Sequence, residues 1–166
     1  MPWTTPPTHN VGEPLTASDW NIAANDLTYL YNFMNAGTGG TTGTIVATSE
    51  TTTSTGFTGL TTAGPIVTVT TGYNAIVILT ANISTTVSGS IGYMGYDVSG
   101  GSTISAAASK SIQFGTNNVA NVIQCSSIFL STGLTPGSNT FTAKYRTSVS
   151  GSSTFSNRNL IVIPLP

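Results

Sequence analysis

From residue 44 to the C-terminus, short segments rich in Thr, Val and Ile alternate with turn signals, and this alternation strongly constrains the fold. The turns are marked by small or turn-forming residues, as in the runs 99–102 and 135–139. No helix-length pattern separates the segments, which argues against β-α-β units. About eight or nine short strands with regular turns predict an all-β fold, a jelly-roll-like β-sandwich.

The expected strands lie near residues 44–49, 65–71, 74–85, 91–98, 110–114, 119–130, 140–149, 153–155 and 159–165. Disorder is the competing interpretation of so much Thr, Ser and Gly. Disordered chains combine low hydrophobicity with high charge. Here 39% of the residues are apolar and only 5% are charged, so we expect a folded chain.

The scarcity of charge also limits the partners. Ordinary soluble proteins carry about 25% charged residues, and a net charge of −1 leaves little repulsion between copies, so association is favoured. A nucleic-acid partner is not expected, because a basic face is needed to neutralise phosphates. A membrane partner is not expected either, because no apolar run approaches the ~18 residues that span a bilayer. The start of the chain lacks the pattern of a signal peptide, which favours the cytosol.

The N-terminal third differs in character from the rest. We expect an anchoring arm and helix over residues 1–36, a Gly/Thr linker over 37–43, and a β head domain over 44–166. Prolines deny helix to the first residues and favour an extended arm. An arm without its own core must dock to become ordered, and the candidate anchoring residues are Trp3, Pro6, Pro7 and Leu15.

Residues 16–34 predict a helix. Thr16 is a natural N-cap, with Asp19 three residues later as a capping-box variant, and Leu15 with Trp20 fits a hydrophobic staple. Asp26 shares a helix face with Asp19 and is expected on a solvated flank. An apolar stripe recurs at spacings of three and four residues, typical of helix–helix contacts, and its members are Trp20, Ala24, Leu27, Tyr31 and Met34.

Two partners are open to this stripe. It could pack on the chain's own β domain, or against copies of itself around a symmetry axis. The glycine-rich linker favours the second, because a flexible tether gives the helix no fixed docking angle. Runs such as 76–79 and 160–163 are apolar on both faces, so their second face must be covered by the chain's own loops or, as we favour, by a neighbouring subunit.

Residues suited to catalysis or metal binding are few. His9, in the arm, is a lone histidine, so neither a catalytic triad nor a clustered metal site is expected. Cys125 is expected to be a buried, inert thiol. In the β domain the carboxylates are Glu50 and Asp97, without aromatic surroundings suited to a sugar. We therefore expect no enzyme activity and no cofactor. Asp97 and Arg158, both placed at strand ends, are expected to fix a turn or a subunit register.

Two stretches resemble proteins of tailed bacteriophages. Residues 3–6 and 12–21, which read WTTP and GEPLTASDWN, are similar to the N-terminal segments of virion proteins. Residues 132–146 and 154–165 are similar to the end of jelly-roll domains in trimeric decoration and fibre-type proteins. Together they cover less than a third of the chain. The adjacent prolines at positions 6 and 7 depart from the N-terminal pattern.

The resemblance implies a homotrimeric virion component with a jelly-roll head, assembled in the host cytoplasm. As a capsid decoration (cement) protein, it would bind the major capsid protein or another virion protein through its arm and helix. As the head of a tail or head fibre, it would bind a host receptor or surface glycan. Loops near Gly100 or Asn117 would then contact the host, and Tyr93 and Tyr96 would stack on sugars unless they pack in the core.

Overall fold

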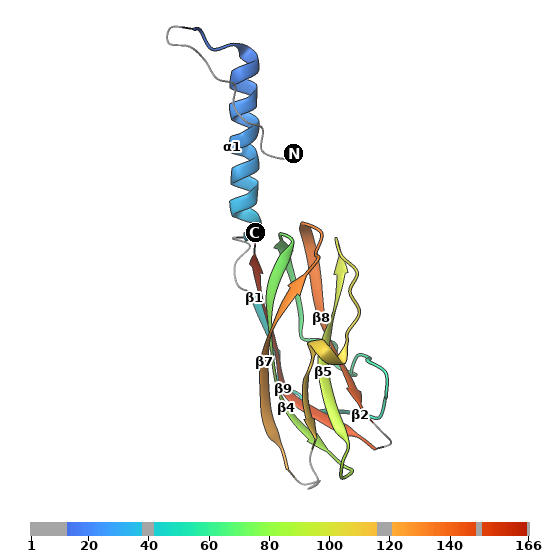
Figure 1. Ribbon diagram of the computed structural model, residues 1–166. Helices are drawn as coiled ribbons and strands as arrows, with labels where there is room; N and C mark the ends of the chain where they lie inside the picture. Colours follow the sequence, from blue (N-terminus) through green and yellow to red (C-terminus); the bar gives the residue numbers. More distant parts are fainter. Residues whose placement is uncertain (1–12, 38–41, 116–120, 149–150, 166) are drawn as a thin grey trace.

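The computed structural model describes residues 13–37, 42–115, 121–148 and 151–165. Within these residues one helix, α1 (Ala17–Gly37), is followed by strands that form a two-layered β domain (Figure 1). The strands are β1 (Thr42–Val46), β2 (Glu50–Thr52), β3 (Ile66–Thr71), β4 (Asn74–Thr85), β5 (Ile91–Gly100), β6 (Ile112–Gly115), β7 (Ile123–Thr132), β8 (Gly137–Thr147) and β9 (Ser153–Leu165). A short 3-10 turn, Ala108–Lys110, precedes β6.

Two antiparallel sheets face each other. Sheet I has the order β1-β9-β4-β7, with β2 also paired to β9, and sheet II has the order β3-β8-β5-β6. The chain changes sheet at every connection except β1 to β2 and β5 to β6. Because β1 and β2 pair with different parts of β9, the sheets contain eight strand positions, as in a jelly roll. The expected all-β sandwich with an N-terminal helix is confirmed.

The core lies between the sheets and follows the alternation of the strands. In β8, Phe141, Ala143 and Tyr145 point inward and are essentially inaccessible, as the pattern of that strand predicts. Val77 and Leu79 of β4 are also fully buried. Ile76 and Ile78, which alternate with them in the strand, lie on the outer face of sheet I and are only half-buried. The runs that are apolar on both faces therefore bury one face in the core.

Three differences from the expected strands have local causes. Strand β2 is three residues long and carries too little pattern to be recognised. Strand β8 begins at Gly137, inside an expected turn, because its first residues pair with the end of β3. The two last expected strands form one strand, β9, interrupted by a bulge. Asn157 there has a positive φ of 48°, which Asn tolerates better than most residues, and β9 keeps its pairing with β4 on both sides.

Candidate assembly surface

The start of α1 is built as the sequence indicates. The backbone N–H of Asp19 donates to the Thr16 hydroxyl at 3.3 Å, and the backbone N–H of Thr16 donates to the Asp19 carboxylate at 2.6 Å. These reciprocal bonds form the capping box, and the Asp19 N–H is shared with the Thr16 carbonyl, which accepts from it at 3.1 Å. The helix continues to Gly37, three residues beyond the expected end. Asp26, expected on a solvated flank, is instead buried.

The apolar stripe of α1 is not covered by the described part of the chain. The helix extends away from one end of the sandwich, which it approaches near its C-terminal end (Figure 1). Trp20 is 64% exposed, while Leu27 and Tyr31 are each 67% exposed, and Ala24 is also exposed. The side chain of Met34 lies outside the described residues. Packing of these four side chains on the chain's own β domain, one of the two alternatives, is therefore not observed.

Of the candidate anchoring residues, Leu15 lies within the described part of the chain. Trp3, Pro6 and Pro7 lie outside the described residues, as does His9. Leu15 is 54% exposed beside the helix start, and Trp20, its expected staple partner, is exposed as well. The N-terminal end of α1 thus presents two large apolar side chains to solvent.

Arg158 has a structural role, but it lies inside β9 and not at a strand end. Its guanidinium is fully buried, with Nη1 3.3 Å from the Glu50 carboxylate and Nη2 donating to the Thr48 carbonyl at 3.2 Å. The group also lies over the Tyr145 ring, 5.4 Å from the centroid. A buried cation is tolerated when it is paired in this way. The pair ties the β1–β2 segment to β9.

Glu50 is fixed from a second side. Its carboxylate accepts hydrogen bonds from the Thr62 hydroxyl at 2.5 Å and the Thr62 backbone N–H at 2.9 Å. The hydroxyl bond contributes most to lowering the pKa of Glu50, and the N–H bond and the Arg158 charge lower it further against partial desolvation. The carboxylate is therefore held in its charged form. The sequence does not reveal the partners of Glu50, Thr62 and Arg158, because both are distant from it along the chain.

Asp97 likewise lies inside its strand, β5, on the outer face of sheet II. One carboxylate oxygen is 3.5 Å from the Lys144 ammonium, and the other accepts the backbone N–H of Ala106 at 2.7 Å. The second bond fixes the segment after β5. The expected placement of Asp97 at a strand end was wrong, and its role in fixing a turn or a subunit register stays a prediction.

Neither tyrosine considered for sugar stacking presents a free ring. Tyr96 is 1% exposed and belongs to the core, near Phe129 and Phe141. Tyr93 points to the outer face of sheet II but is covered, with the Arg146 guanidinium 4.0 Å above its ring and Phe57 edge-on at 6.5 Å. The sequence does not reveal this cluster because Phe57 comes from a loop. Gly100 has a positive φ of 102° at the end of β5, and Asn117 lies outside the described residues.

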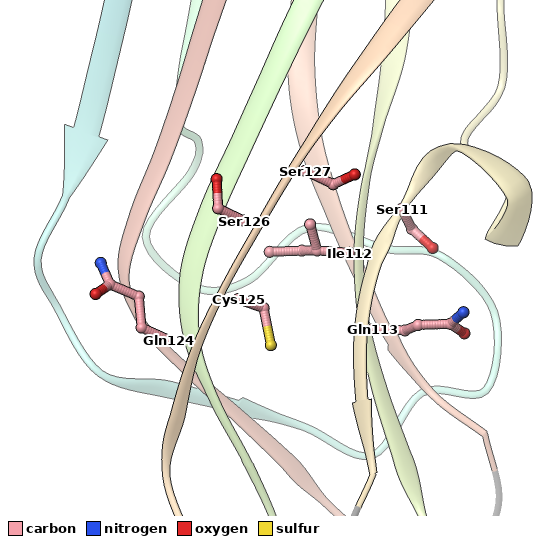
Figure 2. Close-up of a pocket in the computed structure, with 7 residues that line it drawn as sticks. All are labelled: Ser111, Ile112, Gln113, Gln124, Cys125, Ser126 and Ser127. Atoms are coloured by element: carbon pink, nitrogen blue, oxygen red, sulfur yellow. The ribbon is translucent and has the colours of Figure 1, made fainter.

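A cleft opens between the edges of the two sheets, where β6 and β7 face each other (Figure 2). Its volume is about 460 Å³, and seven residues line it: Ser111, Ile112, Gln113, Gln124, Cys125, Ser126 and Ser127. Cys125 is half-buried here, not fully buried as expected. Partial burial raises the pKa of its thiol, so the reactive thiolate is disfavoured. None of the seven lining residues is an acid, a histidine or a lysine, so this lining supplies no general base.

The described residues contain no group of three or more His, Cys, Asp or Glu side chains that could hold a metal ion. In the same part of the chain, no helix has both the length and the apolar character needed to cross a membrane.

Comparison with known proteins gives little further information. No family model matches the sequence, and no curated protein matches it either. Among solved structures, the chain is similar to one from the structure of infectious bursal disease virus, Gx strain, with 12% identity and a TM-score of 0.46. The match covers 75% of this chain and 32% of the other, so this chain spans about a third of its neighbour's length. A structural similarity this weak gives no information about the function of this chain.

Proposed function

We propose that the chain is a structural subunit of a bacteriophage virion that acts as a homotrimer and not as an enzyme. The uncovered stripe of α1 carries the proposal. Most helix stability in proteins comes from packing of an apolar face against another surface. A helix that exposes Trp20, Leu27 and Tyr31 to water therefore needs a partner. Parallel copies of the same helix offer matching stripes.

Within the virion, the proposed role is that of a capsid decoration protein. The arm and α1 would bind the major capsid protein or another virion protein, and the β domain would face outward. The resemblance of residues 3–6 and 12–21 to N-terminal segments of phage virion proteins supports the virion role, which the capsid and fibre alternatives share.

The number of copies per particle tests the placement. In virions purified from cells that produce this chain, quantitative mass spectrometry against the major capsid protein should give hundreds of copies per particle. A handful of copies would place the chain in the tail or a fibre instead, where binding of a host glycan becomes the function to test. Absence of the chain from virions would contradict the virion role altogether.

Point variants on the helix test the role of the stripe. Leu27→Gln should reduce both self-association and binding of the full chain to particles that lack it. Asn25→Gln is the matched control, because Asn25 is an exposed neighbour in the same helix that does not belong to the stripe. Equal binding by the two variants would contradict the role of the stripe.

A further inference from the structure

The outer face of sheet I carries a block of aliphatic side chains across three adjacent strands. In the pairing register, Ile76 of β4 lies opposite Leu130 of β7 and Ile163 of β9. One row further, Ile78 of β4 lies opposite Ile128 of β7 and Ile161 of β9. Opposed side chains in such pairs are about 5 Å apart. These six residues therefore form one continuous surface, which we call the sheet I patch.

The sheet I patch is accessible in the single chain and has a polar border. Ile128 is 67% exposed and Leu130 is 57% exposed, while the other four side chains are half-buried. The next row along the strands is polar, with Thr80 opposite Ser126 and Asn159. An apolar centre with a polar rim is the usual anatomy of a protein interface. Single soluble chains seldom expose apolar patches larger than a few hundred Å².

The two sheets differ sharply in the charge of their outer faces. The outer face of sheet II carries Asp97, Lys144 and Arg146. Phe57, from the loop between β2 and β3, covers part of the same face. Strands β1, β4 and β7 of sheet I contain no charged residue, and the charged residues of β9 and β2, Arg158 and Glu50, are paired with each other and largely buried. Sheet II is therefore suited to water, whereas an uncharged outer face on sheet I is suited to contact with another protein surface.

The position of the sheet I patch relative to α1 indicates which surface that is. The patch lies in the half of sheet I where β9 ends, since Asn74 at the start of β4 pairs with Leu165. Figure 1 shows this end of the sandwich next to the base of α1. Copies that associate in parallel through α1 would bring these ends of their β domains together.

We propose that the sheet I patch is the contact through which the β domains of neighbouring copies of this chain pack, with sheet II facing outward. The inference rests on the proposed homotrimer, and it adds a second interface on the head to the one on the helix. A second copy fits because an uncharged apolar face meets no electrostatic penalty against another of its kind.

Thiol protection in the full chain tests this contact. Cys125→Ser removes the natural thiol, and Leu130→Cys or Ile128→Cys then places a reporter in the sheet I patch. Ile66→Cys is the matched control, because Ile66 is 43% exposed on the outer face of sheet II. In the oligomer, a polar maleimide should label the two patch thiols at least tenfold more slowly than the control thiol.

The outcomes separate this inference from the proposed function, because the mass of each variant is measured by light scattering. Equal labelling of patch and control thiols in an oligomer would overturn the sheet I contact and leave helix association standing. A monomeric natural chain would overturn both. Slow labelling of patch thiols in a monomer would also overturn the contact, since protection would then come from within one chain. Two independent patch positions guard against a single variant that fails to fold.

Discussion

Arg158 shows how one side chain can connect distant parts of the fold. Its charge is buried between the sheets and is paired with Glu50 from β2, while its other nitrogen binds the carbonyl of Thr48. The Lys144–Asp97 pair has similar chemistry but lies at the surface of sheet II. Buried and exposed ion pairs respond differently to loss of one partner, because solvent compensates only the exposed charge.

Arg158→Met should therefore lower the free energy of unfolding by about 3 kcal/mol, since Glu50 and the Thr48 carbonyl lose their partner. Lys144→Met, the control at the exposed pair, should cost no more than about 1 kcal/mol. Urea unfolding of both variants measures the difference. Similar losses for the two would show that burial of the Arg158 pair does not contribute.

The lowered pKa of Glu50 predicts a pH dependence. Because its pKa in the folded chain lies below the ordinary value of about 4.3, the charged carboxylate stabilises the fold at neutral pH. That contribution should be complete above the unfolded-state pKa and disappear as the pH falls through the folded-state pKa. The stability difference between the natural chain and Glu50→Gln should thus shrink as the pH is lowered from about 6 towards about 3, a window that contains the ordinary pKa. A difference independent of pH would contradict this role.

At this scale the sequence identified residues better than it identified contacts. Arg158 and Asp97 stood out because charges are scarce, and both make structural contacts. Glu50 was not connected to Arg158, because pairing between residues so far apart in sequence depends on which strands become neighbours. Phe57 and Arg146 were not recognised as a cover for Tyr93 for the same reason.

At the scale of elements, the strands with clear alternation were predicted well. Strand β4 has the expected bounds, and β8 has the expected inner and outer faces. The errors occur where tertiary pairing overrides a local turn signal, as at Gly137, or where a bulge lets one strand continue, as at Asn157. The capping residues predicted the start of α1 closely. Its end was predicted three residues too early.

The capping box of α1 gives an element-scale prediction. Thr16→Ala should destabilise the helix by about 1 kcal/mol, because it removes the hydroxyl that accepts from the backbone N–H of Asp19 and donates to the Asp19 carboxylate. Ser18→Ala, at an exposed site in the same turn, is the control. Thermal melting followed by the helical circular dichroism signal should show an earlier loss for Thr16→Ala. If both variants melt alike, the cap does not limit the helix.

At the scale of the whole molecule, the distribution of polarity is the informative property. The sequence predicted that strands apolar on both faces would need a cover, and the structure places a block of exposed and half-buried aliphatic side chains on the outer face of sheet I and an exposed apolar stripe on α1. The sequence alone does not reveal which sheet face carries these side chains, because that depends on the order of the strands within each sheet. The proposed trimer accounts for both surfaces with one kind of partner.

The mass of the full chain in solution tests this account most directly. Multi-angle light scattering across a range of concentrations should give three times the chain mass of 17.0 kDa. Leu27→Gln and Leu130→Thr should each shift that mass downward at low concentration, whereas Asn25→Gln should not. A mass of one chain at every concentration would contradict the claim that sister subunits cover the helix stripe and the sheet I patch.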